Sequence, residues 1–461
     1  MRPLLKKPTL DRVMLSSNRP ISNLSLVSKT IERLVYAILT THINSQLLLS
    51  ITQSAYRANH STETALVKVH NDLIQMVDAG WVGGLVLLDL SAAFDTVNHS
   101  LMLDILRERF GITDTALQWF TSYFHNRSHT VLLQDDRSRV RYSTYGVPQG
   151  SVLGPKTFIT YTEELSNIFS GYDLRHHSYA DDVQMYGGAK PVNISTVWDE
   201  LQRCAADVKA WCSSRGLQLN AAKTELMWFG TAGNLKKISD EITDVKILGH
   251  PIAPASDVRN LGVLFDSTLE FRNHATTKLA QTSFYILRRL RSIRGKISQE
   301  DATSLVVSLV FSRLDYCNSL LANLPAITLA PLQRVQNAAV RLVLDLKPTQ
   351  HTSPGLRQLH WLPVTWRIKF KLCVLVYRAV HGSSPSYIMD LVIPSPNTSL
   401  RSCARGDLVV PRTKLRLGER AFGVAGPQEW NSLPPEIRTL PSLDLFKTGL
   451  KTHFFKLAFP G

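Results

Sequence analysis

The chain has 461 residues, of which 44% are hydrophobic and 19% are charged. This length and composition are typical of a folded protein of about two to four domains, and they exclude a disordered chain. No apolar run approaches the roughly 20 residues that cross a bilayer, so we expect no membrane partner.

The N-terminus and the cysteines indicate the compartment. The first residues, MRPLLKKPTLDR, lack the apolar core of a signal peptide, so we do not expect secretion. The cysteines show no CxxC spacing, which argues against a zinc knuckle and against a disulfide framework. This pattern fits a reducing compartment inside the cell. The five cysteines are Cys204, Cys212, Cys317, Cys373 and Cys403.

The net charge of +15 is confined to one part of the chain. Residues 276–461 contain 25 Lys and Arg against 10 Asp and Glu, whereas residues 1–275 contain 27 of each kind. Such asymmetry predicts a region that binds a polyanion beside a neutral region, and nucleic acid is the polyanion we expect.

The spacing of apolar residues predicts a mixture of helices and strands that do not alternate regularly. This favours an α+β sheet with helices on one face over a doubly wound fold. From about residue 273 to 382 the pattern is almost wholly helical, and residues 383–461, rich in Pro and Arg, give no clear pattern. In chain order we expect a helix over 66–80, a buried strand ending at Asp89, a helix over 99–111, a hairpin over 130–150, a helix over 153–169, a hairpin over 176–186, a helix over 195–216, and strands over 224–230 and 258–266.

The stretch HHSYADDVQMY, residues 176–186, sets Asp181 and Asp182 side by side between apolar runs. Taken alone, it is most simply an exposed turn, with His176 and His177 at the surface. If the strand ending at Asp89 lies beside this hairpin, three carboxylates converge and repel each other unless cations neutralise them. Magnesium suits such a site because it prefers oxygen ligands and leaves positions open for phosphate. Two such ions about 3.5–4 Å apart can serve nucleotidyl transfer.

Seven segments, taken in order, resemble the reverse transcriptases of non-LTR, LINE-type retrotransposons. They are NRPISNLSLVSKTIERLV, QSAYRANHSTETAL, LLDLSAAFDTVNH, GVPQGSVLGP, YADD, GLQLNAAKTELM and RNLGVLFD, and they are distributed along residues 16–266. Two later segments, PLQRVQNAAVRLVL and LHWLPVTWRIKFKLCVLVYRAVHG, resemble the C-terminal part of such elements. The resemblance removes the simple-turn interpretation of the paired aspartates.

The resemblance implies a role for each catalytic residue. Asp89, Asp181 and Asp182 would form the triad that holds two Mg²⁺ ions, and the carbonyl of Leu90 would add a metal ligand. Lys223 matches the lysine that protonates the pyrophosphate leaving group, and an ordinary surface lysine is the alternative interpretation.

The resemblance also implies a nucleotide site. Phe94 lies where polymerases of this kind discriminate against the sugar 2′-OH, and a packing phenylalanine is the alternative. Gln149 and Gly150 lie at a turn entering a helix, where backbone can approach the nucleotide, and a plain helix entry is the alternative. Arg19 and Lys29 would grip the triphosphate.

Two further segments are expected to contact nucleic acid. Asn260, Leu261 and Gly262 match the loop that supports the primer end, and otherwise form an ordinary β-turn. Independently of the resemblance, residues 276–296 predict a basic helix whose apolar stripe leaves most basic residues outward. We expect this helix to follow the phosphates of a template–primer duplex, and a solvated basic helix is the alternative. The arginines concerned are Arg288, Arg291 and Arg294.

The implied fold is an α+β right-hand polymerase in four parts. Residues 1–75 would form partial fingers, 76–272 a palm with a small antiparallel sheet and interleaved fingers segments, 273–345 a helical thumb, and 346–461 a basic C-terminal region. Full elements of the family carry an upstream endonuclease domain, and we expect this chain to be a fragment that lacks it. The segment PKTFITYTEEL is more polar than the matching helix of the family, so we expect it to disturb packing.

The function implied is that of an RNA-directed DNA polymerase, which adds dNTPs to a primer 3′-OH with two Mg²⁺ ions. Its partners would be an RNA template, a DNA primer or RNA–DNA hybrid, and dNTPs, in the nucleus or a cytoplasmic ribonucleoprotein. An inactive retrotransposon relic that only binds nucleic acid is the alternative. A palm-type RNA-dependent RNA polymerase is a third interpretation, against which Phe94 and YADD in place of GDD argue.

Overall fold

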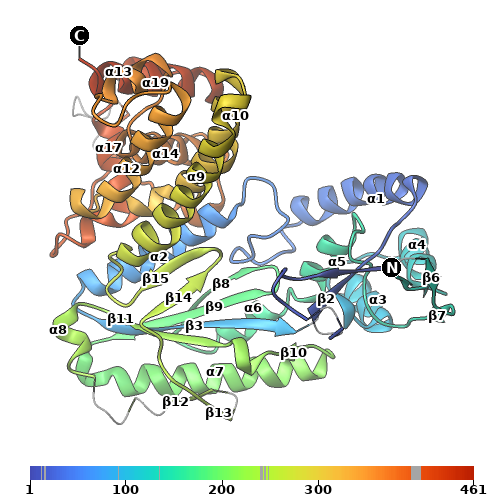
Figure 1. Cartoon of the computed structure of the whole chain (residues 1–461). Coiled ribbons are helices and arrows are strands. Elements are labelled where there is room, and N and C mark those ends of the chain that lie inside the picture. Colours follow the sequence, from blue (N-terminus) through green and yellow to red (C-terminus); the bar gives the residue numbers. More distant parts are fainter. Residues whose placement is uncertain are drawn as a thin grey trace.

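The structure is a computed structural model, and it describes residues 1–11, 13–14, 17–91, 93–133, 135–238, 242, 245–247, 249–395 and 406–460. A mixed α and β part holds the central sheet, and a helical part that contains the C-terminal end stands on one side of it (Figure 1). The predicted α+β class is confirmed.

A five-stranded antiparallel sheet forms the centre of the mixed part. Its central strand, β3 (Val82–Ser91), pairs along its length with β9 (Asp182–Ala189). The predicted neighbourhood of the Asp89 strand and the 176–186 hairpin is therefore confirmed. The remaining strands are β8 (Arg175–Tyr179), which pairs with β9, and β10 (Gln218–Leu219) and β11 (Glu225–Phe229), which pair with β3.

Helices cover both faces of this sheet, so the expectation of helices on one face is wrong (Figure 1). On one face α7 (Ile194–Ser214) buries an apolar stripe that includes Leu201 and Val208. On the other face lies α2 (Thr62–Asp78), which begins with a capping box formed by Ser61 and Thr64. The physical reason lies in β3, whose residues are apolar on both sides of the strand and need cover on both.

The elements that precede and flank the sheet surround the end of β3 where Asp89 lies. They are β1 (Arg2–Leu5), β2 (Asn18–Ile21), α1 (Leu26–Ser45), the short helix η2 (Ala93–Asp95), α3 (His99–Glu108), α4 (Asp114–Phe124), β4 (Ser128–His129), β5 (Leu132–Leu133), β6 (Asp136–Arg137), β7 (Arg141–Tyr142), α5 (Gly154–Tyr161) and α6 (Leu165–Phe169).

The polar segment PKTFITYTEEL, residues 155–165, was expected to disturb packing, but it forms most of α5 and leads into α6. The hydroxyls of Thr157 and Thr160 donate to the carbonyls four residues earlier, at 3.0 and 2.7 Å. The ammonium of Lys156, only 1% exposed, donates to the carbonyl of Tyr56 at 3.1 Å. These polar groups are buried with partners, which removes most of the cost of burying them.

The described residues between 274 and 458 confirm the prediction of a helical region and extend it beyond residue 382. After the strands β12 (Val245–Ile247), β13 (His250–Ile252), β14 (Asp257–Asn260) and β15 (Val263–Asp266) come the π-helical turns η6 (His274–Gln281) and η8 (Val307–Phe311) and the helices α9 (Thr282–Ile293), α10 (Gln299–Val306), α11 (Ser312–Leu314), α12 (Ala326–Val343), α13 (Ser353–Gln358), α14 (Val364–Val380), α15 (Ser386–Met389), α17 (Phe422–Asn431), α18 (Pro435–Arg438) and α19 (Leu443–Ala458).

The helical part is fixed to the sheet through α2. Asn71 accepts a hydrogen bond from the backbone N–H of Gly423 at 2.9 Å, and Asp78 accepts one from that of Leu415 at 2.7 Å. One hydrophobic core runs continuously from α2 and the sheet to α19. Within the described residues, the helices are all too short or too polar to span a bilayer.

Candidate active site

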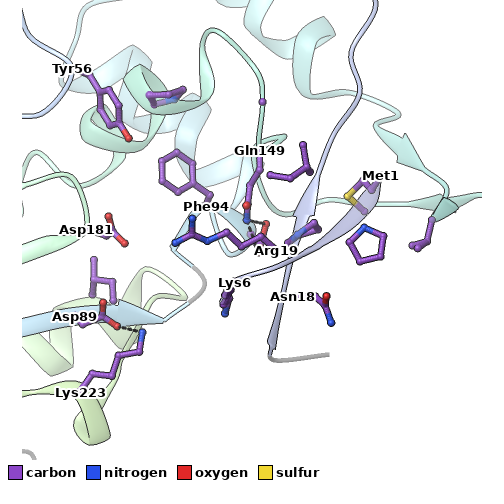
Figure 2. A pocket seen from close by; sticks show the side chains of 18 residues that line it. Met1, Lys6, Asn18, Arg19, Tyr56, Asp89, Phe94, Gln149, Asp181 and Lys223 are labelled. Atoms are coloured by element: carbon purple, nitrogen blue, oxygen red, sulfur yellow. Dashed lines mark hydrogen bonds and ion pairs between the residues drawn. The ribbon is translucent and has the colours of Figure 1, made fainter. Parts of the chain in front are cut away.

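The end of β3 and the tip of the β8–β9 hairpin border a cleft of about 810 Å³ (Figure 2). Most of the catalytic and nucleotide-binding residues expected from sequence line this cleft, although they come from segments far apart in the chain. Those residues are Arg19, Asp89, Leu90, Phe94, Gln149, Gly150, Asp181 and Lys223.

Strand pairing brings the predicted carboxylates together. Asp89 lies directly opposite Asp182 in the antiparallel register of β3 and β9. Asp181 occupies the hairpin tip after Ala180, which adopts a left-handed backbone with φ 58°. The side-chain oxygen of Gln53 accepts from the N–H of Ala180 at 3.1 Å and so fixes this tip from a neighbouring segment.

The charges of these carboxylates are coupled. Burial, followed by the charges of Asp181 and Asp89, raises the pKa of Asp182 from the ordinary 3.8 to about 6, while Lys223 opposes the shift. Burial also raises the pKa of Asp181, followed by the charge of Asp89, while Lys223 and Arg19 oppose the shift. Asp182 is exposed, so solvent screens these charges and keeps the energetic cost of its ionisation small.

Lys223 lies beside the carboxylates, as expected. Its ammonium donates to Asp89 Oδ2 at 2.8 Å from a side chain that is 63% exposed (Figure 2). The backbone holds this arrangement as well, because the N–H of Asn220 donates to the carbonyl of Asp89 at 2.9 Å.

Phe94 and Gln149 occupy the opposite wall. The ring of Phe94 stacks on that of Phe158, with centroids 4.9 Å apart and planes inclined by 24°. Gly150 has φ 110°, and a Cβ there would lie 2.9 Å from the carbonyl oxygen of Ser22, so only glycine fits.

Tyr56 and Asp95 are among the cleft residues that sequence reasoning missed. Tyr56 belongs to the segment QSAYRANHSTETAL, adopts φ 56° and extends its hydroxyl towards Asp181 (Figure 2). Asp95 directly follows Phe94. Lys29, in contrast, lies on α1 and is not among the residues that line the cleft.

The turn at Asn260, Leu261 and Gly262 lies outside the cleft lining, between β14 and β15. Asn260 is buried, and its amide donates to the side-chain oxygen of Gln184 at 2.6 Å. The hydroxyl of Tyr316 donates to the carbonyl of Leu261 at 2.6 Å. The side chains of Gln184 and Tyr316 therefore fix this turn on the side that faces the protein interior.

The three arginines of the basic helix are not equivalent. Arg288 and Arg291 are exposed on α9, as expected. The guanidinium of Arg294 instead donates to the carbonyls of Leu342 and Val343, at 2.9 and 3.0 Å. These carbonyls end α12, where backbone acceptors lack helical partners and favour a cation. The expectation that Arg294 points outward is wrong.

The expectation that His176 and His177 lie at the surface is also wrong. Residues 52–54 run beside β8 and cover it, with backbone hydrogen bonds to Ser178. His177 is 1% exposed, its Nε2 lies 2.8 Å from the hydroxyl of Ser54, and burial lowers its pKa to about 3. The Ser54 hydroxyl also contacts that of Tyr387, on α15, at 2.7 Å.

The donor set fits a divalent cation in its chemistry. Carboxylate oxygens are the ligands that Mg²⁺ prefers. The raised pKa values of Asp181 and Asp182 come first from burial and then from the repulsion between the carboxylates, which a cation would relieve. In the described part of the chain, however, no three acidic, His or Cys side chains converge closely enough to hold an ion as they stand. To bind an ion, the carboxylate of Asp89 would have to break its ion pair with Lys223.

The profile of the family described as "Reverse transcriptase (RNA-dependent DNA polymerase)" matches residues 5–263. This match covers more than half of the chain. The chain belongs to the reverse transcriptase family, and the expected resemblance to non-LTR retrotransposon enzymes is confirmed.

Its curated relatives come from mobile elements of Drosophila. The chain is 27% identical over 320 residues to the RNA-directed DNA polymerase from mobile element jockey of Drosophila funebris, covering 68% of this chain and 34% of the relative. It is 25% identical over 351 residues to the probable RNA-directed DNA polymerase from transposon X-element of Drosophila melanogaster, covering 74% of this chain and 37% of the relative. The chain thus spans about a third of the length of these relatives.

Similar solved structures include an apo telomerase from Candida tropicalis, with a TM-score of 0.38 and 11% identity over 68% of this chain and 50% of that one. The RNA-dependent RNA polymerase of a human picobirnavirus gives a TM-score of 0.34 and 12% identity over 78% of this chain and 63% of that one.

The coupled carboxylates predict how stability depends on pH. The raised pKa of Asp182 means that the folded state favours its protonated form, so ionisation between about pH 4 and pH 7 lowers the free energy of unfolding. Asp182→Asn should therefore raise the melting temperature at pH 7 by about 1–2 °C, and the gain should vanish near pH 4. Differential scanning fluorimetry across this range measures the effect, with Asp173→Asn, at the other end of the hairpin, as control. A loss of stability at pH 7 would contradict the coupling.

Proposed function

We propose that this chain is the polymerase portion of a non-LTR retrotransposon enzyme and adds dNTPs to a primer 3′-OH on an RNA template. The observation that carries the proposal is the register that sets Asp89 opposite Asp182, next to Asp181 at the edge of a nucleotide-sized cleft. Membership of the reverse transcriptase family supports the same reaction.

The proposed architecture is a right-hand polymerase. The central sheet with α7 would act as the palm within residues 76–272. Residues 1–75, which include most of α2, would supply part of the fingers. Residues 273–345 would form the thumb. The described residues of the basic C-terminal region, 346–461, share one hydrophobic core with that thumb and with α2 and the sheet, so we propose that this region stays packed against both.

Asp89, Asp181 and Asp182, with the carbonyl of Leu90, would hold two Mg²⁺ ions. When bound, the ions supply a positive charge that activates the attacking oxygen and stabilises the leaving one. Lys223 holds Asp89 at 2.8 Å, and on its release would carry a proton to the pyrophosphate. Arg19, exposed on β2 in the cleft lining, would bind the triphosphate.

Phe94 would select the sugar. Its ring is held by the stack on Phe158 and lines the cleft between Asp89 and Gln149. A rigid aromatic edge at this place would collide with a 2′-OH and leave space for a deoxyribose. Gly150 would let the backbone approach the nucleotide beside it.

The nucleic-acid partners would be an RNA template and a DNA primer or RNA–DNA hybrid. The exposed Arg288 and Arg291 would contact the phosphates of the duplex, whereas Arg294 is used inside the protein. The turn at 260–262 would support the primer end from its outer side. We propose a location in the nucleus or in a cytoplasmic ribonucleoprotein.

Primer extension on poly(rA)/oligo(dT) with Mg²⁺ tests the proposal. Asp181→Asn keeps the shape of the side chain but removes a metal-binding charge, so kcat should fall by about a hundredfold or more. Affinity for template–primer, measured by fluorescence anisotropy, should stay within about threefold, because chemistry fails before binding does. Asp173→Asn, exposed at the far end of the same hairpin, should extend primers normally.

Unchanged extension by Asp181→Asn would remove this residue from the site. A wild-type protein that binds template–primer and does not extend it would support the relic that only binds nucleic acid.

Phe94→Val should raise the ratio of ribonucleotide to deoxyribonucleotide kcat/KM by at least about tenfold. This change needs only about 1.4 kcal/mol of differential transition-state stabilisation, which the removal of a steric clash can supply. Single-nucleotide incorporation with matched rNTP and dNTP measures the ratio. The control Phe455→Val, on α19, should leave it unchanged, and an unaltered ratio in Phe94→Val would show that Phe94 only packs.

A further inference from the structure

Asp95 is a residue of the cleft to which neither sequence pattern nor resemblance gave a role. It lies between the 810 Å³ cleft and a second hollow of about 400 Å³, and it lines both, as does Gln149. The carboxylate of Asp95 and the amide of Gln149 therefore meet where the two hollows join.

The contact between the two side chains is direct. The amide nitrogen of Gln149 donates to both carboxylate oxygens of Asp95, at 3.0 and 3.1 Å (Figure 2). A carboxylate only accepts hydrogen bonds, so it binds the nitrogen end of the amide and not the oxygen end. The oxygen Oε1 of Gln149 is thereby left for another group.

The backbones that carry these side chains are also joined. The N–H of Val147 donates to the carbonyl of Phe94 at 2.8 Å, and that of Gly146 donates to the carbonyl of Val97 at 2.7 Å. A Cβ at Gly146 would lie 2.9 Å from the carbonyl oxygen of Asp95, so the close approach requires glycine. The pairing of Asp95 with Gln149 thus follows from the docking of two chain segments.

We propose that Asp95 is a positioning residue that fixes the amide of Gln149, so that its oxygen faces the incoming nucleotide as a hydrogen-bond acceptor. This acceptor oxygen would bind a hydroxyl or amine group of the nucleotide that donates a hydrogen bond. The inference rests on the proposed function, since it assigns Gln149 to the nucleotide site. Burial raises the pKa of Asp95, and the amide of Gln149 and the charge of Lys6 oppose this shift.

A double-mutant cycle tests whether Asp95 acts through Gln149. Asp95→Leu, similar in shape but without an acceptor, should raise the KM for dNTP by about fivefold to twentyfold with kcat changed less than threefold. Gln149→Ala should do the same, and the double variant should be no worse than Gln149→Ala alone. Asp95→Asn keeps one acceptor for the amide and should bring KM back to within about threefold of wild type. Asp104→Asn, exposed on α3, is the control.

The same cycle is measured in parallel as the Kd of dNTP in the presence of Ca²⁺ and template–primer, where binding is read without chemistry. Additive effects of Asp95→Leu and Gln149→Ala, or an Asp95→Asn variant as weak as Asp95→Leu, would overturn the inference and leave the proposed function standing. A wild-type protein that binds dNTP without extending primers would overturn the function, and the Kd cycle would still decide the role of Asp95. Absence of dNTP binding would overturn the role of Asp95.

Discussion

The antiparallel register of β3 and β9 is the constraint on which the site depends. It sets Asp89 against Asp182 and leaves Asp181 at the turn, so residues 92 positions apart in sequence share one end of a sheet. A slip of one residue would send these side chains to opposite faces. The register is secured because both faces of the sheet are buried, under α7 on one side and α2 on the other.

The register concentrates like charges, and the surrounding structure holds them in place. Gln53 binds the backbone beside Asp181, and the segment that carries Gln53 is attached to β8 by backbone hydrogen bonds. The buried contact of Ser54 with both His177 and Tyr387 links this segment to the helical part of the chain. The helices beyond residue 263, where the family profile ends, therefore support the hairpin that carries the carboxylates.

The sequence was sufficient to predict those elements for which the spacing of apolar residues and the family motifs agree. The paired aspartates, the strand ending at Asp89 and the helices of residues 273–382 all follow from apolar spacing and from the family motifs. Contacts between residues far apart in the sequence could not be predicted from these local patterns. Arg294 is directed to the end of α12, and His177 is covered by a segment more than a hundred residues earlier. A role for Asp95 could be inferred only from its contact with Gln149 in the structure.

The central claim is that strand pairing builds a two-metal site, and the most direct measurement counts metal ions. Mn²⁺ binding can be followed by electron paramagnetic resonance on the protein with template–primer and a dNTP that cannot be cleaved between its α and β phosphates. The account predicts two ions per wild-type chain, and fewer for Asp89→Asn with the exposed Asp104→Asn unchanged. Equal ion counts for wild type and Asp89→Asn would contradict it.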